Sequence, residues 1–270
     1  MSKMFDALRR AEAERKRKVA ENDISAVPER AESPHVEAAH EARITRPVPL
    51  REAPAVLTDS PSGELLRELG ILRNSLEARL EQGEKRVLLF TSAMHEEGVT
   101  TLAVAYSRLL AMHGQQRVLL VELNARRPAL GERLGIGDGE GVTHYFREGR
   151  SLSGLVRHMP SDGFDVLRVG DADPTQIQIH LEKFFPRLRA EALKSYDTVI
   201  VDAPPIVLSP ETPPIGPLVD GVVVVVLCGK TKRETVQRSI NLVQQFNGRV
   251  VGVVLNRKRY FIPNFIYRRL

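Results

Sequence analysis

Along much of the chain, short apolar runs alternate with segments whose apolar residues recur at helical spacing. The runs consist almost entirely of Val, Ile and Leu, which is typical of strands that are buried on both faces. Such strands need helices on both sides of the sheet, so the alternation predicts a doubly wound, mostly parallel α/β fold. The predicted strands are RVLLFT, RVLLVEL, FDVLRVG, TVIVDAP, GVVVVVL and VVGVVLN.

Four segments carry apolar residues at the spacing of an amphipathic helix. The first follows Asp59 or Ser60, either of which can cap a helix. We therefore expect the folded α/β domain to span residues 59–256. The four segments are ELLRELGILRNSLEARL, the stretch 100–113, EKFFPRLRAEALKSY and TKRETVQRSINLVQQF.

The two ends of the chain differ in composition from this domain. Residues 1–20 place apolar residues such as Phe5 and Leu8 at helical spacing, which predicts an amphipathic helix for docking to a partner or a lipid surface. Residues 21–58 are rich in Ala, Glu, Pro and Arg without apolar periodicity, which is typical of a disordered linker. Residues 257–270 are predicted to form a basic, aromatic tail.

Charge is unevenly distributed along the chain. The formal net charge is +5, with RKRK near one end and RKRY and YRRL near the other. Such clusters suit acidic lipid, nucleic acid or an acidic partner, although a solvated surface is the commoner explanation. Aromatic residues make up only 5% of the chain, tryptophan is absent and no nucleic-acid-binding motif is visible. We therefore expect no nucleic-acid ligand.

The sequence predicts no transmembrane segment. Its longest uninterrupted apolar stretch, VVVVVLC at 222–228, is far shorter than the roughly 20 residues that a membrane helix needs. The charged N-terminal residues also lack the apolar region of a signal peptide. A single cysteine excludes an internal disulfide and suits the reducing cytoplasm, where we expect the protein to reside.

Ligands of doubly wound proteins bind beyond the carboxyl ends of the strands, so the residues that follow each strand carry functional information. Three such segments are SAMHEEGVTT, ELNARRPAL and DAPP. The first stands where a phosphate-binding loop would end in Gly-Lys-Thr or Gly-Lys-Ser, but Val99 takes the place of the lysine. The sequence therefore suggests a nucleotide fold with altered chemistry.

Together these segments resemble the bacterial tyrosine kinases of capsular and exopolysaccharide synthesis, part of the deviant P-loop group that includes cell-division and plasmid-partition ATPases. The resemblance covers residues 60–256, plus an N-terminal segment like that of many family members. It implies a P-loop NTPase-like fold and a magnesium-nucleotide site in which Asn256 contacts adenine. The segments that carry it are ARRPAL, GEGVTHYF, YDTVIVDAPP, DGVVVVV and GVVLN.

The phosphate loop departs from the family pattern Pro-Gly-Glu-Gly-Lys-Thr-Thr, whose places are held here by residues 95–101. Gly98, Thr100 and Thr101 remain as vestigial nucleotide-binding positions, but the lysine is lost at Val99. Losing that charge-assisted contact costs roughly tenfold to a hundredfold in phosphate affinity. Glu96 replaces a glycine, which adds a negative charge and favours a misshapen phosphate cradle.

The second Walker motif is also altered. The resemblance places Glu122 near magnesium and Asn124 where the family has the aspartate that acts on the attacking hydroxyl. An asparagine amide cannot act as a general base, whereas Glu122, Asp202 and Thr100 retain oxygens that suit magnesium. Arg126 corresponds to a family arginine near the phosphates. We expect no certain cofactor, and at most weak binding of Mg-ATP or Mg-ADP.

Two further family features are incomplete. The family is phosphorylated on a C-terminal tyrosine cluster, and this tail holds only Tyr260 and Tyr267, which suit packing or docking as well as phosphorylation. The self-association motif Glu-x-x-Arg-x-x-Arg keeps Glu64 and Arg67, but Gly70 takes its third place.

These features favour a pseudokinase in exopolysaccharide or capsule biosynthesis. It would be a regulatory partner of a membrane polysaccharide copolymerase, or chain-length protein, held at the inner membrane through that partner. The alternative is an active but weak ATP-dependent tyrosine autokinase or ATPase that relies on residues such as Glu122, Asp202 and Arg126. A third hypothesis, a membrane-bound spatial organiser, depends on nucleotide-driven dimerisation that this loop disfavours.

Overall fold

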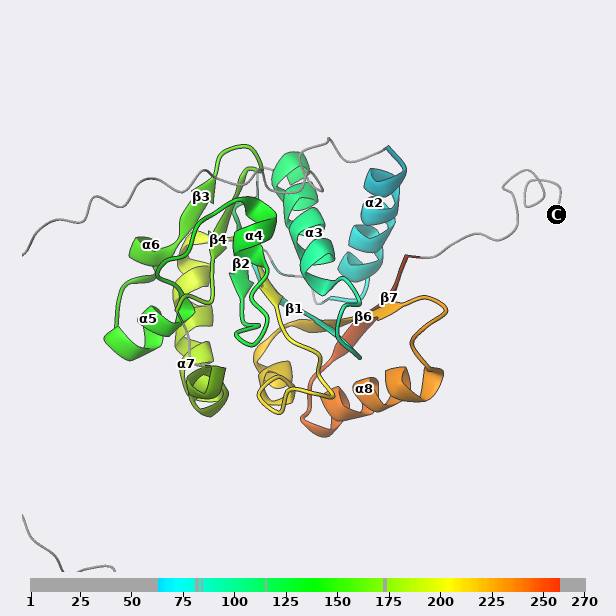
Figure 1. Ribbon diagram of the computed structural model, residues 1–270. Helices are drawn as coiled ribbons and strands as arrows, with labels where there is room; N and C mark the ends of the chain where they lie inside the picture. Colours follow the sequence, from blue (N-terminus) through cyan, green and yellow to red (C-terminus); the bar gives the residue numbers. More distant parts are fainter. Residues whose placement is uncertain (1–62, 81–82, 84, 115, 172–173, 258–270) are drawn as a thin grey trace, which may run out of the picture. The chain divides into compact units, whose positions relative to one another are not determined.

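A seven-stranded sheet organises the part of the chain that the computed structural model describes, residues 63–80, 83, 85–114, 116–171 and 174–257 (Figure 1). These residues all fall within one unit, Leu50–Leu270. The predicted N-terminal helix and linker lie outside the described residues, as do Tyr260 and Tyr267. The predictions for those segments therefore stay predictions.

The strand order is β3-β4-β2-β5-β1-β6-β7, and all neighbours are parallel except β3 and β4. This arrangement confirms the predicted doubly wound, mostly parallel fold. The antiparallel β3 was not predicted because its three residues, RHM, form no apolar run. The strands are β1 (Arg86–Ser92), β2 (Val118–Glu122), β3 (Arg157–Met159), β4 (Phe164–Leu167), β5 (Thr198–Asp202), β6 (Gly221–Leu227) and β7 (Val250–Asn256).

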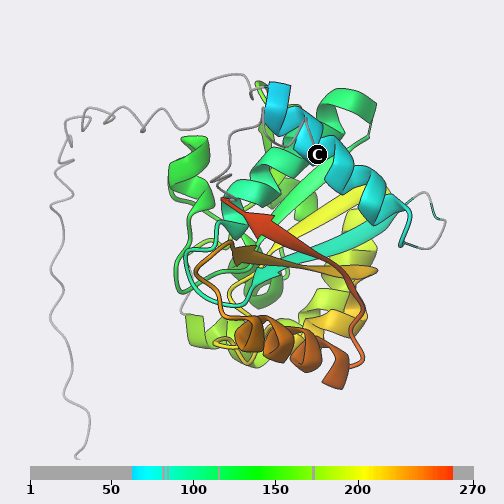
Figure 2. The same cartoon turned by 90° about the vertical axis from the view of Figure 1, so that its right-hand side faces the viewer.

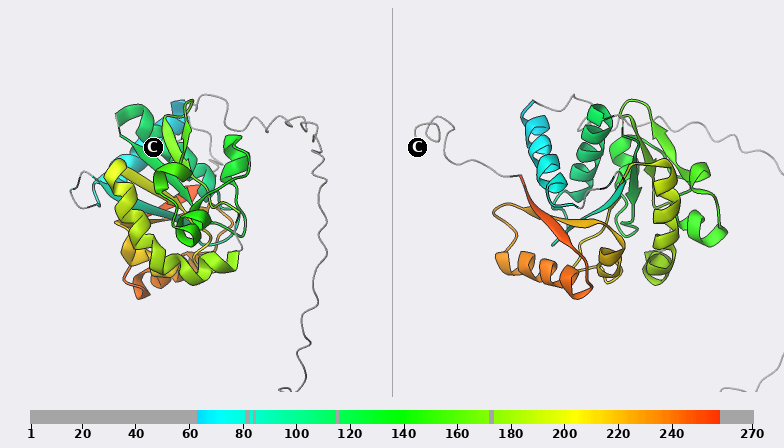
Figure 3. Two further views of the ribbon diagram at one scale, coloured as in Figure 1. Left: turned by 90° about the vertical axis from the view of Figure 1, so that its left-hand side faces the viewer. Right: turned by 180° about the vertical axis from the view of Figure 1, so that it is seen from behind.

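Helices cover both faces of the sheet, as the apolar strands require (Figures 1 and 3). The helices α2 (Gly63–Glu77) and α3 (Val99–Gly114) pack on one face, whereas α7 (Pro174–Ser195) and α8 (Arg233–Gln245) pack on the other. No helix in the described part of the chain has the length and apolarity needed to cross a membrane. The shorter helices are α4 (Leu130–Leu134), α5 (Val142–Glu148), α6 (Leu152–Leu155) and the 3-10 helix η1 (Pro213–Leu218).

The strand β7 lies at one edge of the sheet (Figure 2). It is less buried than its apolar sequence predicts. Val253 and Leu255 pair with β6 residues that face the α8 side, yet they remain 40% and 57% exposed. The four strands β1, β2, β5 and β6 are almost wholly buried, because each has neighbours on both sides. The expectation of burial on both faces therefore holds for the centre of the sheet and fails at this edge.

Candidate nucleotide site

The loop between β1 and α3, residues 93–98, contains two residues in the left-handed conformation, Glu96 with φ 63° and Gly98 with φ 88°. Gly98 has no space for a side chain, because a Cβ would lie 2.2 Å from Nδ2 of Asn256. Glu96 pays about 1 kcal/mol for a conformation that glycine adopts freely. The φ angle of Glu96 remains in the region that favours glycine. This angle therefore gives no sign of the misshapen phosphate cradle that the sequence analysis expects.

Val99, at the position of the family's lysine, is the first residue of α3. Its side chain is only 8% exposed and belongs to the apolar cluster that α2 and α3 form on their side of the sheet. The position thus supplies packing where the family pattern supplies a positive charge.

Glu97 organises the loop from within. Its carboxylate is buried, and Oε2 accepts hydrogen bonds from the backbone N–H groups of Ala93 and Met94, both at 2.8 Å. Oε1 accepts from the N–H of Leu227 at 3.2 Å and from the hydroxyl of Thr231. The carboxylate therefore ties the loop after β1 to the end of β6.

Asn256, predicted to contact adenine, is hydrogen-bonded inside the protein at both ends of its amide. Its Nδ2 donates to the carbonyl of Glu97 at 2.8 Å, and its Oδ1 accepts from the N–H of Arg257 at 2.8 Å. The end of β7 is thus joined to the same loop as the end of β6.

Asp202 ends β5, between the ends of β1 and β2. It is 1% exposed, and neither carboxylate oxygen has a hydrogen-bond partner. Burial, and to a smaller extent the negative charge of Glu122, raises the pKa of this carboxyl to about 7, against the opposing influence of the nearby Thr100 hydroxyl. Asp202 therefore has two unused acceptor oxygens beside the start of α3.

Glu122, at the end of β2, is also buried but is bound to the backbone. Its Oε1 accepts from the N–H groups of Ala129 and Leu130, at 2.7 and 2.9 Å, and its Oε2 accepts from the N–H of Val169 at 3.3 Å. The first two donors lie at the beginning of α4, so Glu122 satisfies helix N–H groups that would otherwise lack acceptors. One free lone pair on Oε2 is all that this carboxylate retains for a metal.

The segment after β2 carries the remaining predicted residues. The Oδ1 of Asn124 accepts from the backbone N–H of Arg127 at 3.2 Å, so the amide shapes a turn. The guanidinium of Arg127 lies 3.5 Å from Glu96 across the loop, and that of Arg126 lies 4.0 Å from Glu211. Both arginines are exposed at this end of the sheet, with carboxylates as neighbours.

The oxygens present suit part of a magnesium-nucleotide site. Asp202 and Thr100 would hold the metal, because Mg²⁺ commonly binds one or two protein oxygens together with phosphate oxygens. The described residues contain no group of three or more His, Cys, Asp or Glu side chains that could hold a metal ion by themselves. The phosphate side fits less well, since Val99 brings no charge and Glu96 brings a negative one.

Three predicted residues remain, Thr101 on α3 and Glu64 and Arg67 on α2. Thr101 is half-buried in the first turn of α3. Glu64 and Arg67 are exposed on α2, where Arg67 forms an ion pair with Glu68 at 2.9 Å. The sequence analysis assigned Glu97 no role, and its internal partners lie at Ala93, Met94, Leu227 and Thr231.

Comparisons with known proteins give a consistent picture. The chain is 26% identical to tyrosine-protein kinase YwqD of Bacillus subtilis over 188 residues, which cover 70% of this chain and 79% of YwqD. It is 24% identical to tyrosine-protein kinase etk of Escherichia coli over 206 residues, 76% of this chain but only 28% of that relative. The chain thus spans little more than a quarter of the longer relative. No protein-family profile matches it.

Solved structures share the fold. The kinase domain of Escherichia coli ETK superposes with a TM-score of 0.70 at 23% identity, covering 81% of this chain and 88% of that domain. Cobyrinic acid a,c-diamide synthase from Mycobacterium smegmatis, solved with an ATP analogue and magnesium, gives a TM-score of 0.51 at 24% identity and covers 63% of this chain and 72% of that one. Sequence and fold together identify the chain as a relative of the bacterial tyrosine kinases of capsule and exopolysaccharide biosynthesis, built on a P-loop NTPase-like fold.

Proposed function

We propose that this protein is a catalytically impaired homologue of the bacterial tyrosine kinases that acts as a cytoplasmic regulatory partner of a membrane polysaccharide copolymerase. The observation that carries the proposal is the burial of Val99 in the apolar cluster of α2 and α3. A phosphate loop without its lysine lacks the side chain that reaches the β- and γ-phosphates. In this proposal the fold is retained, but the loop between β1 and α3 binds phosphate more weakly.

The position of the general base supports the same proposal. Asn124 has no basic oxygen, and its carbonyl oxygen is engaged by the backbone of Arg127. Phosphoryl transfer depends on positioning and charge stabilisation more than on covalent chemistry, so the losses at Val99 and Asn124 affect separate requirements of one reaction.

One observation favours the alternative, a weak autokinase or ATPase. Asp202 keeps two unpartnered oxygens beside Thr100, and these atoms suit Mg²⁺ together with a nucleotide phosphate. Arg126 and Arg127 could then supply part of the missing positive charge. Weak binding of Mg-ADP or Mg-ATP is compatible with both proposals, whereas rapid phosphotransfer is compatible only with the alternative.

An autophosphorylation assay with labelled ATP and an added tyrosine peptide separates the two functions. We expect no transfer above background from the natural sequence, and little from Val99→Lys alone. The triple change Glu96→Gly, Val99→Lys and Asn124→Asp should raise transfer most, since it restores the charge, the glycine and the base together. Calorimetry with Mg-ATP checks binding for each variant. Robust transfer by the natural protein would overturn the pseudokinase proposal.

Recruitment to the copolymerase is tested separately. Deleting residues 1–20 should leave the α/β domain folded, because residues between Leu69 and Val251 themselves supply a buried apolar cluster on each face of the sheet. We expect the truncated protein to be recovered less well in a pull-down with the cytoplasmic part of the copolymerase. Undiminished recovery would exclude the docking role of this segment.

A further inference from the structure

Two arginines follow β2 at the edge of the sheet where the loop between β1 and α3 also lies. Each has a carboxylate from another part of the chain beside it. The guanidinium of Arg127 lies 3.5 Å from Oε1 of Glu96, and that of Arg126 lies 4.0 Å from Oε1 of Glu211. Glu96 belongs to the loop after β1, and Glu211 to the segment between β5 and η1. The protein's own carboxylates therefore lie beside guanidinium groups of the kind that bind phosphate.

The two ion pairs differ in burial. The side chain of Glu211 is only 5% exposed, so the surrounding fold holds it in place. The side chain of Glu96 is 86% exposed, and that of Arg127 is 59% exposed. Water solvates both charges when an exposed pair opens, so such a pair contributes little to stability. The contact between Glu96 and Arg127 is therefore the one that a ligand can displace.

The backbone holds both residues of this exposed pair in position. The N–H of Arg127 donates to Oδ1 of Asn124 at 3.2 Å, which stabilises the turn after β2. Glu96 has a φ of 63°, in the left-handed region that residues other than glycine seldom adopt. Such residues gather at ligand clamps and switches, where the surrounding structure holds them. The next residue, Glu97, is buried and anchors the loop, while the side chain of Glu96 stays at the surface.

A ligand phosphate and Glu96 compete for the same cation. A guanidinium binds a carboxylate or a phosphate through its N–H donors, most strongly through two at once. A phosphate on Arg127 would bring its negative charge next to the carboxylate of Glu96, and the two anions repel each other. The carboxylate then has to turn into water, which its high exposure allows.

We propose that this contact is a latch, in which Glu96 substitutes for a ligand phosphate at Arg127. The carboxylate must leave Arg127 before a phosphate or diphosphate anion binds at this edge of the sheet. This regulation rests on the proposed function, because it acts on the same weakened phosphate loop. Phosphate affinity is then limited by the latch as well as by the absence of a lysine at Val99.

Calorimetry with inorganic pyrophosphate in a phosphate-free buffer measures this competition in the full chain. Glu96→Gln removes the carboxylate and should strengthen pyrophosphate binding by about two- to fivefold, since exposed ion pairs contribute up to about that much. Glu132→Gln removes the same charge from an exposed position on α4, and it should change affinity by less than about 1.5-fold. Equal gains in the two variants would reduce the effect to net charge and refute the latch.

Two further variants separate the release of Arg127 from the loss of repulsion. In an Arg127→Gln background, Glu96→Gln should give a clearly smaller gain, because no guanidinium remains to be released. Repulsion alone predicts the same gain or a larger one, since Arg127 no longer offsets the charge of Glu96. Glu96→Asp keeps the negative charge but shortens the side chain, so it should also strengthen binding, although less than Glu96→Gln. Unchanged affinity in Glu96→Asp, or an undiminished gain without Arg127, would contradict the proposal.

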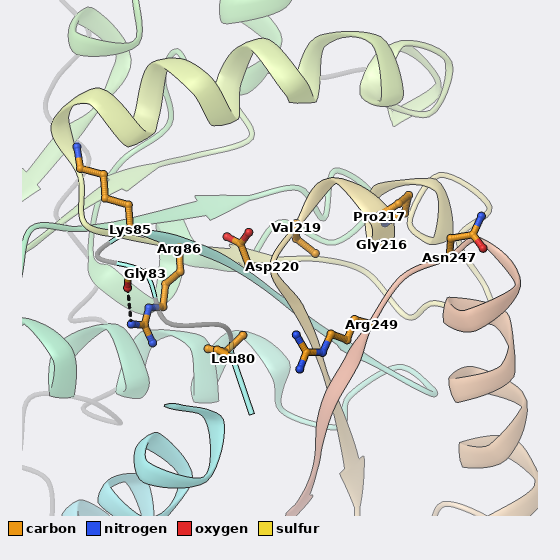
Figure 4. Close-up of a pocket in the computed structure, with 10 residues that line it drawn as sticks. All are labelled: Leu80, Gly83, Lys85, Arg86, Gly216, Pro217, Val219, Asp220, Asn247 and Arg249. Atoms are coloured by element: carbon orange, nitrogen blue, oxygen red, sulfur yellow. Dashed lines mark hydrogen bonds between the residues drawn. The ribbon is translucent and has the colours of Figure 1, made fainter. Parts of the chain in front are cut away.

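Backbone amide chemical shifts locate the bound pyrophosphate in the natural protein. We expect shifts at Glu96 and Arg127. A pocket lined by Lys85 and Arg86, among others, lies where β1 begins, at the opposite edge of the sheet (Figure 4). Gly216 also lines that pocket, so its amide reports binding there separately. Shifts at Gly216 without shifts at Glu96 and Arg127, or no binding by any variant, would overturn the latch.

The latch and the proposed function fail on different results. Robust autophosphorylation by the natural protein would overturn the pseudokinase proposal, whereas the latch would still be decided by pyrophosphate binding to Glu96→Gln. Unchanged pyrophosphate affinity in Glu96→Gln would overturn the latch and leave the losses at Val99 and Asn124 as they are.

Discussion

Glu122 and Asp202 are buried carboxylates that end neighbouring strands and are paired in register between β2 and β5. Glu122 accepts three backbone N–H groups from α4 and from the segment after β4. Asp202 accepts none, and its pKa is raised to about 7. The two carboxylates differ because the backbone N–H groups of Ala129 and Leu130 donate to Glu122, whereas the hydroxyl of Thr100 is the main group that favours the charged form of Asp202.

The contrast separates a structural carboxylate from one with unused binding capacity. Both residues were predicted to hold magnesium, and that prediction remains untested. Asp202 is better placed than Glu122 to bind a metal ion. Oε1 of Glu122 already accepts two hydrogen bonds, whereas neither oxygen of Asp202 accepts one. A buried polar atom without a partner is destabilising unless a ligand completes it.

Removing the hydrogen-bonded carboxylate of Glu122 should have the largest effect on stability. Glu122→Leu leaves three backbone N–H groups without acceptors, and we expect the free energy of unfolding to fall by about 4 kcal/mol. Urea denaturation of the folded fraction measures the change. Glu132→Leu, an exposed glutamate in α4, is the control and should shift stability by less than about 0.5 kcal/mol. If Glu122→Leu changed the free energy of unfolding as little as the control does, the structural role assigned to Glu122 would be wrong.

Asp202→Asn should act in the opposite direction and depend on pH. The folded-state pKa of about 7 lies above the value of about 3.9 for an exposed aspartate. The stability from the favoured protonated form is therefore present in full below about pH 4 and is lost as pH rises to 7. We expect the asparagine variant to match the natural protein at pH 4 and to exceed it by about 4 kcal/mol at pH 8.

Thermal or urea unfolding of both proteins at several pH values measures this difference. Taking the difference between the two proteins cancels the other titrating groups, such as Asp197, whose pKa is lowered by Arg117. A stability difference that does not change between pH 4 and pH 8 would mean that Asp202 has a partner in solution. Added Mg²⁺ with nucleotide should stabilise only the natural protein if Asp202 binds the metal.

A change at Glu97 tests whether a hydrogen-bonded carboxylate in the loop after β1 contributes to stability as Glu122 does. Glu97→Gln turns one acceptor oxygen into an NH₂ group that faces N–H donors, and we expect a loss of about 2 kcal/mol. Hydrogen exchange at the amides of Ala93 and Met94 should accelerate with it. The neighbouring Glu96→Gln is the matched control, since that side chain is exposed, and it should leave both measurements nearly unchanged.

The smallest effect is expected for Glu96→Gly. The change relieves a left-handed glutamate and removes only an exposed ion pair with Arg127, so unfolding should cost about 1 kcal/mol more than in the natural protein. A melting-temperature shift measures it. Gly98→Ala reverses the experiment, because its Cβ would meet Asn256, and it should lower the melting temperature. A destabilising Glu96→Gly would show that the ion pair outweighs the backbone strain.

The sequence was sufficient for the central strands because their apolar runs require burial on both faces. It was insufficient for β3, because its three residues RHM form no apolar run and only the structure shows that they pair with β4. The exposure of Val253 and Leu255 was also beyond reach, since their strand resembles a central strand and its place at the edge is a property of the topology.

The candidate site shows a similar division. The loss of the lysine at Val99 and of the base at Asn124 follows directly from residue type. The partners of Glu122 could not be read from sequence, because Val169 lies far along the chain and reaches it only through the pairing of β2 with β4. The links from Glu97 to Leu227 and from Asn256 to Glu97 likewise join segments that only the folded sheet brings together.

The position of β1 in the sheet has a consequence during protein synthesis. Arg86 pairs with Thr198 and Leu88 pairs with Gly221, so both neighbours of this strand are made long after it. At ordinary translation rates the apolar run RVLLF leaves the ribosome on the order of ten seconds before β5 follows. The run therefore stays without its neighbouring strands during that interval, and we expect a fragment that ends before residue 198 to aggregate instead of forming a smaller domain.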